Sequence, residues 1–286
     1  MKQVYLNGRF IPFDQGRVSV EDRGFQFGDG AYEVIRVYSG RPFRLRPHLE
    51  RLARTLQGLE IPTPEPTEKI EGVVREFSAE APESMVYLQV TRGAAPRNHA
   101  FPRDAKPTFV AYAMDAKADP PGRAYSLATV PDDRWAHCDL KTICLLSNVL
   151  AKQKAARAGA DEALFVRDDG AVTEGASSNA FLVRDGALYT HPATNRILNG
   201  ISRLALIELA QASGLRVFET PFTREEALKA DEFFMTRTST EVMPIARIDG
   251  RAIGRGAAPG PVSRRLREGF DALIRAECRY SSPVPQ

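Results

Sequence analysis

The first part of the chain predicts a small sheet covered by helices. Apolar and polar positions alternate on both sides of Asn7-Gly8, a pair typical of a two-residue β-hairpin. The same alternation predicts strands at 31–38, 85–91 and 108–114. Two further segments instead repeat apolar side chains every three or four residues, which predicts amphipathic helices at 47–58 and 67–80. This half is therefore mixed α and β, without a regular β-α-β series.

The second part of the chain alternates between the two periodicities. Strands are expected at 125–130, 161–167, 179–184, 215–219 and 232–236, and helices at 146–158, 200–214, 223–229 and 261–276. Between the halves lies DAKADPPGR, a polar stretch with paired prolines that is typical of a linker. We therefore predict an α+β protein of two mixed α/β domains, 1–115 and 123–286, joined by a linker at 116–122.

Composition excludes several classes of function. The 286 residues are 43% hydrophobic and 26% charged, and 39 Lys and Arg against 36 Asp and Glu leave a net charge of +3. That charge is too small for the basic face that nonspecific nucleic-acid binding requires. No apolar run is long enough to span a membrane, and the N-terminus resembles a strand more than a signal peptide, so we expect a cytoplasmic protein. Three cysteines without CxxC spacing and four scattered histidines predict neither a disulfide framework nor a metal site.

Two loops combine glycine, proline and charged residues. Residues 21–33, EDRGFQFGDGAYE, are either a phosphate-cradling loop or a structural turn before the strand at 31–38, and they match neither the dinucleotide-binding nor the P-loop pattern. Residues 96–103, PRNHAFPR, bring Arg97, His99 and Arg103 together. This loop is either an anion-binding loop, since guanidinium matches a carboxylate, or simply solvated.

Other candidate groups lie in the second half. The chain has only eight lysines, and Lys141 lies in a partly apolar stretch, where a lowered pKa would suit a Schiff-base lysine. Glu174 in TEGASSN is either a functional acid or part of a surface turn. Ser202 opens a helix behind Gly200, which suits either phosphate binding or a plain N-cap. TRTSTE, residues 236–241, offers hydroxyl groups to an anion.

Seven motifs, taken in order, give these candidates a common meaning. EDRGFQFGDGAYEVIRVY, RPHLERL, QVTRGAAPRNHAFP, DDRWAHCDLKTICLLSNVLAKQKA, TEGASSNAFLV, THPATNRILNGISR and DEFFMTRTSTEVMP resemble the motifs of the fold-type IV (class IV) pyridoxal-phosphate-dependent aminotransferases. Within that family the chain is most similar to D-amino acid aminotransferases. The resemblance covers residues 3–250. It implies the fold of that family, with pyridoxal 5'-phosphate held between the two domains.

The resemblance also implies a role for each candidate residue. Lys141 matches the lysine that binds the cofactor aldehyde and shuttles the substrate proton, and Glu174 matches the acid that keeps the pyridine nitrogen protonated. The remaining cofactor contacts match Arg51, Ile201, Ser202 and Thr238 at the phosphate and Leu198 at the ring. The substrate carboxylate binders match Tyr32, Arg97 and His99. Arg237 departs from the family pattern, which has a small hydroxyl residue there.

The implied reaction is transfer of an amino group from a D-amino acid, such as D-alanine, to 2-oxoglutarate or pyruvate by a ping-pong mechanism. The pair Arg97 and His99 reaches the neighbouring subunit's site in the family, so a homodimer is expected. Three alternatives keep the fold: a branched-chain L-amino acid transaminase, an (R)-amine transaminase and an aminodeoxychorismate lyase. A non-catalytic binding protein of the same fold is an alternative of another class.

Overall fold

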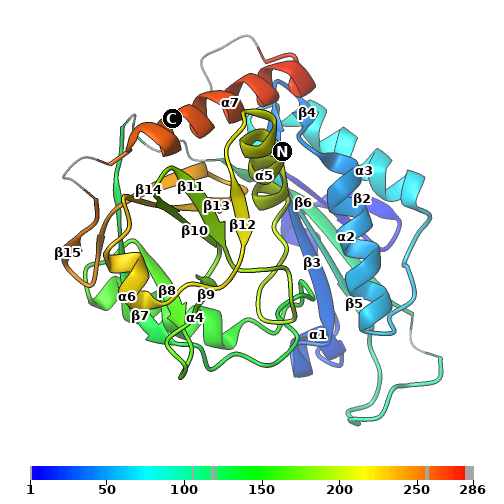
Figure 1. The fold of residues 1–286 in the computed structure, drawn as a ribbon. Coiled ribbons are helices and arrows are strands. Elements are labelled where there is room, and N and C mark those ends of the chain that lie inside the picture. Colours follow the sequence, from blue (N-terminus) through cyan, green and yellow to red (C-terminus); the bar gives the residue numbers. More distant parts are fainter. Residues whose placement is uncertain (1, 105, 117–119, 121, 255–257, 281–286) are drawn as a thin grey trace. The chain divides into compact units, whose positions relative to one another are not determined.

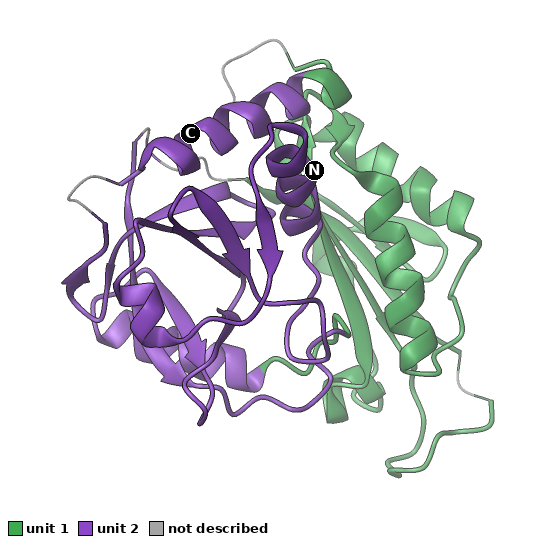
Figure 2. Cartoon of the chain, in the orientation of Figure 1, with its two compact units in different colours: residues 1–117, 140–145, 276–281 green, residues 118–139, 146–275, 282–286 purple. Residues whose placement is uncertain are grey.

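The chain divides into two compact units in the computed structural model, which describes residues 2–104, 106–116, 120, 122–254 and 258–280. Unit 1 contains residues 1–117, 140–145 and 276–281, and unit 2 contains residues 118–139, 146–275 and 282–286 (Figure 2). The α+β class is confirmed, because each unit combines helices with strands.

Unit 1 is built on a six-stranded sheet with the order β2-β1-β6-β5-β3-β4. Its strands are β1 (Gln3–Leu6), β2 (Arg9–Pro12), β3 (Gly30–Tyr38), β4 (Arg41–Pro42), β5 (Ser84–Thr91) and β6 (Thr108–Asp115). All of its neighbouring strands are antiparallel. The predicted hairpin is confirmed: Leu6 pairs with Arg9, and Asn7 and Gly8 both have positive φ angles, as a tight hairpin turn requires.

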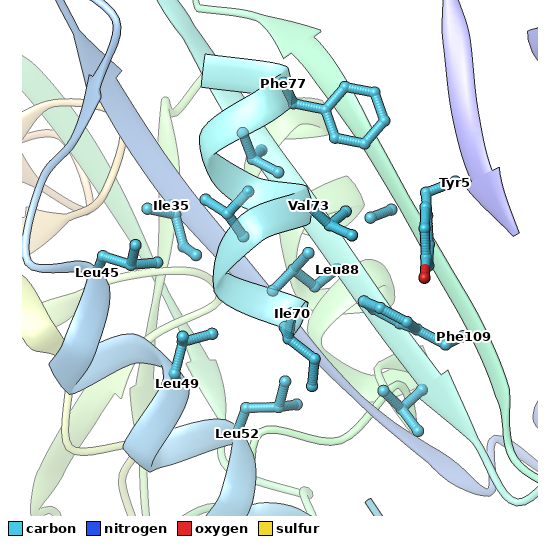
Figure 3. Close-up of a cluster of buried hydrophobic side chains, with 14 of the residues drawn as sticks. Tyr5, Ile35, Leu45, Leu49, Leu52, Ile70, Val73, Phe77, Leu88 and Phe109 are labelled. Atoms are coloured by element: carbon cyan, nitrogen blue, oxygen red, sulfur yellow. The ribbon is translucent and has the colours of Figure 1, made fainter. Parts of the chain in front are cut away.

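Two helices, α2 (Leu45–Gly58) and α3 (Thr67–Glu80), cover one face of this sheet (Figure 1). Their apolar stripes pack on alternate residues of β3 and β5 to form a core around Leu49, Val73, Ile35 and Leu88 (Figure 3). Ala31, Ile35 and Val37 of β3 all belong to this core, which fixes the helix-facing side of the strand. Both helices were predicted, and α3 begins at Thr67 with Pro66 as its N-cap residue.

Unit 2 contains a sheet that closes on itself. Neighbouring strands follow the circuit β10-β13-β14-β7-β8-β9 and return to β10, while β11, β12 and β15 are added outside it. The strands of the circuit are β7 (Tyr125–Pro131), β8 (Glu162–Val166), β9 (Val172–Gly175), β10 (Asn179–Arg184), β13 (Glu232–Arg237) and β14 (Glu241–Ile248). The additions are β11 (Ala187–Thr190), β12 (Val217–Glu219) and β15 (Arg251–Ala252). The closing pair is Glu174 with Asn179.

The helices of unit 2 are α4 (Leu146–Arg157), α5 (Ile201–Ala212), α6 (Arg224–Leu228) and most of α7 (Pro261–Cys278). All four agree with the sequence prediction within a few residues. Strands β9, β11, β14 and β15 were missed, because each is short or follows a turn signal directly. None of the described helices is long and apolar enough to cross a membrane.

The units do not follow the chain as simply as the predicted domains 1–115 and 123–286. Residues 140–145 and 276–281 group with unit 1, although the sequence prediction assigned them to the second domain. The predicted linker 116–122 includes residues 117–119 and 121, which lie outside the described residues. The domain boundary therefore stays a prediction.

Candidate active site

Lys141 belongs to unit 1 because its segment pairs with the first residues of β3. The Lys141 carbonyl accepts a hydrogen bond from the Tyr32 N–H (3.0 Å), and Ile143 N–H donates to the Gly30 carbonyl (3.0 Å). Thr55 of α2 accepts from the Lys141 N–H at 3.2 Å. The Lys141 ammonium nitrogen lies 4.0 Å from the centre of the Tyr32 ring. Two of the predicted site residues are thus brought together.

A buried acid lies on the opposite face of β3, next to Tyr32 in sequence. Glu33 shares the helix-facing side with Ala31 and Ile35, and its side chain is fully buried. Arg51 of α2 donates to both of its oxygens, from Nε to Oε1 (2.7 Å) and from Nη2 to Oε2 (2.8 Å). His48 Nδ1 lies 2.8 Å from Oε2. Residues three apart on a helix share a face, so α2 presents both groups to one carboxylate.

The charges in this cluster follow from its contacts. Burial alone would raise the pKa of Glu33, but Arg51 and His48 outweigh it and hold that pKa well below its ordinary range. Burial lowers the pKa of His48, although Glu33 opposes this. Arg51 is itself only 5% exposed. The cluster is therefore an anion held between a bidentate guanidinium and an imidazole.

Glu174 lies in unit 2 at the point where the sheet closes. Its Oε2 accepts from Asn179 Nδ2 (2.9 Å), and Leu198 N–H is 3.1 Å from each oxygen. Asn179 also donates to the Leu198 carbonyl at 2.8 Å, so one amide links the strand β10 to the loop before α5. Glu174 is 5% exposed and part of a strand, which corrects the surface-turn alternative for TEGASSN.

One arginine divides its hydrogen bonds between Glu174 and a second acid. Arg134 Nη1 donates to Glu174 Oε1 at 2.5 Å, whereas Nε and Nη2 donate to Asp132 at 2.9 Å each. Thr173 Oγ1 also donates to Asp132 (2.7 Å), and the guanidinium lies 4.2 Å from the centre of the Phe165 ring. Burial is the largest influence on the pKa of Glu174 and raises it to about 7, although Arg134 lowers it. Glu174 is therefore poised near neutrality.

The start of α5 lies close to the same network. Gly200 is its N-cap and no side chain caps the helix, which leaves the first-turn N–H groups and the Ser202 hydroxyl beside an uncapped, electropositive end. A Cβ at Gly200 would overlap Asn179 Oδ1, so only glycine permits this approach. Ile201 and Ser202 are both buried.

The strand β13 supplies the remaining hydroxyl groups. Thr236 is the register partner of Asn179, and its buried Oγ1 has no hydrogen-bond partner among the residues that the structure describes. Thr238 follows the end of this strand and is partly exposed. Arg237 donates to Thr240 Oγ1 at 2.9 Å and lies 5.9 Å from the centre of the Tyr125 ring, so it braces the turn that carries Thr238.

Arg97 and His99 lie on an exposed loop of unit 1. The Arg97 guanidinium is 5.0 Å from the centre of the Phe27 ring, and the His99 ring centre is 5.4 Å from the same ring centre. Phe27 ends the short helix α1 (Arg23–Phe27), within the motif EDRGFQFGDG. That motif forms a capped turn, in which Asp22 accepts from the Gly24 N–H at 2.8 Å. The motif therefore forms the structural turn before β3 that the sequence offered as one of two alternatives.

The predicted site residues thus fall into two groups, one in each unit. Unit 1 holds Lys141, Tyr32, Arg51, Arg97 and His99, and unit 2 holds Glu174, Leu198, Ile201, Ser202 and Thr238. No group of three or more His, Cys, Asp or Glu within the described part of the chain is arranged to hold a metal ion. The three cysteines are unpaired.

Sequence reasoning missed Glu33, His48, Asp132, Arg134 and Asn179. Glu33 had a usable signal, because it occupies a position on the apolar face of β3, where a polar side chain needs a partner. His48 and Arg51, three residues apart on α2, were the available partners. Arg134 had no local signal, since Glu174 lies forty residues away.

Comparison with known proteins places this arrangement in a family. The family model "Amino-transferase class IV" matches residues 30–248. The chain is a class IV aminotransferase. A D-alanine aminotransferase from Staphylococcus haemolyticus is 42% identical over 281 residues, which cover 96% of this chain and 99% of the relative. One from Bacillus licheniformis is 40% identical over 279 residues, covering 96% and 98%.

A solved structure has the same fold as this class IV aminotransferase. The T.th. branched-chain amino acid aminotransferase, solved with pyridoxamine 5'-phosphate, superposes with a TM-score of 0.88 and 30% identity. The match covers 97% of this chain and 96% of that one. The fold-type IV resemblance drawn from the seven motifs is therefore confirmed.

Proposed function

We propose that this class IV aminotransferase uses pyridoxal 5'-phosphate to move an amino group from a D-amino acid, such as D-alanine, to a 2-oxo acid by a ping-pong mechanism. The observation that carries the proposal is the full-length identity of about 40% to proteins named D-alanine aminotransferase. The amino acceptor is 2-oxoglutarate or pyruvate, since both present the α-carboxylate that the D-amino acid also carries.

The described residues match the groups that this cofactor needs. An aldehyde needs an amine, a pyridine nitrogen needs an acid, and a phosphate needs N–H and hydroxyl donors. Unit 1 supplies the Lys141 amine, which makes no hydrogen bond with the residues that the structure describes, and unit 2 supplies the Glu174 carboxylate. Unit 2 also has the uncapped start of α5 and the unpartnered Thr236 hydroxyl. The donor set therefore fits pyridoxal 5'-phosphate.

Pyridoxal phosphate, when bound, supplies an electron sink that stabilises negative charge at the substrate Cα. Lys141 would bind its aldehyde and then, released by the incoming amine, move the proton at Cα. The Tyr32 ring beneath the ammonium group holds that side chain by a cation-π contact. Lys141 is thus both nucleophile and proton carrier.

Glu174 would accept a hydrogen bond from the protonated pyridine nitrogen. The Leu198 N–H and the Asn179 side-chain amide donate to the Glu174 carboxylate and fix its plane. Arg134 favours the anionic form of Glu174. An anion there keeps the ring nitrogen protonated, which the electron sink requires. Leu198 would pack against the ring.

The phosphate would bind to several donors. Ile201 N–H and the Ser202 hydroxyl stand at the positive end of α5, where anions are favoured. Thr238 adds a hydroxyl group, and Arg51 adds a cation from unit 1. Glu33 balances the charge of Arg51 and fixes its plane.

Tyr32, Arg97 and His99 would bind the substrate α-carboxylate. We also propose a homodimer in which the loop carrying Arg97 and His99 completes the site of the other subunit. An exposed apolar stripe on α4, formed by Leu146 (70% exposed), Val149 (59%) and Leu150 (60%), supports a subunit interface. A cytoplasmic location stays a prediction.

A branched-chain L-amino acid aminotransferase is the main competing function, because such an enzyme shares the fold. The decisive experiment offers D-alanine and L-leucine separately, each with 2-oxoglutarate, to the purified protein. We expect turnover of D-alanine and little of L-leucine, and Lys141→Ala should abolish it. Turnover of L-leucine with D-alanine inert would contradict the D assignment. Inclusion of an (R)-amine and of aminodeoxychorismate tests the remaining alternatives.

A further inference from the structure

The motif EDRGFQFGDG has no part in the proposed chemistry, yet it contains a buried arginine, Arg23, that is paired with Asp29 of the same motif. Asp29 Oδ2 accepts from Arg23 Nε at 2.8 Å and from Arg92 Nε at 2.8 Å, and its Oδ1 accepts from Arg92 Nη2 at 3.0 Å. Arg23 is 4% exposed and Arg92 is 5% exposed. We call Arg23, Asp29 and Arg92 the loop clamp.

The loop clamp is a charged unit. Burial would raise the pKa of Asp29, but hydrogen bonds from Arg92 and Arg23 outweigh it and hold that pKa below its ordinary value. One carboxylate thus joins two guanidinium groups and leaves a net positive charge. Arg92 also donates to the Glu60 and Leu59 carbonyls, at 2.8 and 2.7 Å, so the clamp is tied to the end of α2.

Arg23 holds the backbone of the loop that carries Arg97 and His99. Its Nη1 donates to the Asn98 carbonyl at 2.5 Å and lies 3.4 Å from the Ala100 carbonyl, and its Nη2 donates to the His99 carbonyl at 3.3 Å. Three consecutive carbonyl groups therefore face one buried guanidinium. Residues 96–101 form neither a strand nor a helix, so these three carbonyl groups have no hydrogen-bond partner from regular secondary structure.

Both ends of the loop are held as well. At its start, Arg23 N–H donates to the Gly93 carbonyl and Ala95 N–H donates to the Glu21 carbonyl. At its end, the Phe101 ring centre lies 3.6 Å from the Arg92 guanidinium. A Cβ at Gly24 would overlap Thr91 Cγ2, so glycine is needed for the motif to lie this close to β5.

The side chains of the loop then project in a fixed direction. With the carbonyls of residues 98–100 turned toward Arg23, Arg97 and His99 pack on the same ring, that of Phe27. Phe27 itself lies 4.9 Å from the Arg23 guanidinium. Residues 22–29 thus contact the loop through both Arg23 and Phe27.

We propose that the loop clamp positions Arg97 and His99 for the substrate α-carboxylate, which makes Arg23 and Asp29 positioning residues for substrate binding. This inference rests on the proposed function, in which those two side chains bind the carboxylate. A loop that is already ordered loses less conformational entropy on binding, so the benefit is in affinity. An interaction that acts equally on substrate and transition state changes KM and leaves kcat.

The test compares Arg23→Met and Arg23→Lys with a matched control, Arg36→Lys. Arg36 is also a buried arginine of unit 1 that donates to a carbonyl, that of Ser84 (3.2 Å), and lies 4.8 Å from a ring centre, that of Tyr38. It does not contact the loop. Each protein is measured as the cofactor-loaded enzyme for amide hydrogen exchange at residues 97–101, for kcat and KM with D-alanine and pyruvate, and for pyridoxal phosphate affinity.

In Arg23→Met we expect faster exchange at 97–101 and KM values raised about tenfold for both substrates, because both carry the carboxylate, with kcat within about twofold. Arg23→Lys keeps the positive charge but loses the planar, multidentate hydrogen bonding of the guanidinium, so its KM should be about threefold above that of the wild type. Cofactor affinity should not change, and Arg36→Lys should match the wild type in KM and in loop exchange.

An unchanged KM in both Arg23 variants, with or without faster exchange, would overturn the inference. So would a KM rise of equal size in Arg36→Lys, since that effect would be general loosening of the unit. If Arg23→Met does not fold, Arg23→Lys alone decides between these results. Absence of D-alanine turnover in the wild type would instead reject the proposed function, before any variant is compared.

Discussion

Two buried glutamates, Glu33 in unit 1 and Glu174 in unit 2, each contact an arginine, yet their pKa values move in opposite directions. Glu33 receives two hydrogen bonds from Arg51 and contacts His48, and its pKa falls well below the ordinary range. Glu174 receives one hydrogen bond from Arg134, whose other donors bind Asp132, and burial raises its pKa to about 7. Arg51 and His48 therefore outweigh burial at Glu33, whereas the divided Arg134 does not outweigh it at Glu174.

The difference suits the two proposed roles. A permanently ionised Glu33 fixes Arg51 for a phosphate. An acid that titrates near neutrality can share a proton with a pyridine nitrogen, and Arg134 biases that sharing toward the anion.

The largest expected effect is on catalysis by Glu174→Gln. The amide cannot hold the ring nitrogen protonated, so kcat should fall by at least about a hundredfold while the fold persists. Steady-state kinetics with D-alanine measure this. Glu162→Gln is the matched control, because Glu162 is a fully buried glutamate on the neighbouring strand β8, bonded to Ser177. An equal loss of kcat in the two variants would show that Glu174 supports the structure of the protein and has no direct role in catalysis.

The same substitution at residue 33 should act on stability. Glu33→Gln removes the carboxylate between the Arg51 guanidinium and the His48 imidazole. The buried Arg51 then lacks its anionic partner, which should lower the free energy of unfolding by about 3–5 kcal/mol. Glu174→Gln should cost about 1 kcal/mol or less at pH 7, where that carboxyl is partly protonated. Denaturant unfolding of both variants checks this. A larger loss at 174 than at 33 would refute the comparison.

Asp132→Asn should reduce the difference in pKa between Glu174 and Glu33. It removes a negative charge that raises the pKa of Glu174 and frees Arg134 donors for it. The pKa of Glu174 should then fall toward its ordinary range. Carbon-13 NMR of labelled glutamate side chains, with the Glu174 signal assigned by its loss in Glu174→Gln, measures the midpoint. A midpoint unchanged or raised would contradict the proposed role of Asp132.

The smallest expected effect is on the pH dependence of stability without cofactor. A carboxyl with a raised pKa binds its proton more tightly when folded, so its contribution is fully present below its ordinary value of 4.5 and is lost as the pH rises to about 7. Glu174→Gln should remove this loss. Thermal unfolding of the wild type and of Glu174→Gln between pH 4.5 and 7.5 tests the direction of this change in stability. A wild type that gained stability relative to the variant as the pH rose would contradict it.

Much of the fold could be predicted from the sequence, because its helices have strong apolar stripes and its hairpin has a specific turn pair. Strand β9, four residues long, carries no period that could identify it, although its partner β10 begins only four residues after β9 ends. Residues 140–145 illustrate a different limit, since they contact Gly30 and Tyr32, which lie over a hundred residues away in the sequence.

The candidate site was predictable only where a motif carried it. Lys141 and Glu174 followed from ordered motifs. Arg134 donates hydrogen bonds to both Asp132 and Glu174, and these contacts depend on distances in space that the spacing of residues in the sequence does not predict. The Asp29 link between Arg23 and Arg92 is of the same kind, because it joins two segments more than sixty residues apart.

The most direct test of D-amino acid transamination is a single half-reaction. The cofactor-loaded protein is mixed with excess D-alanine and no acceptor, and the pyruvate released is counted against protein chains. We predict one pyruvate per chain, conversion of the bound cofactor to its amine form, and no pyruvate from L-alanine. Pyruvate from L-alanine alone, or from neither isomer, would contradict the account.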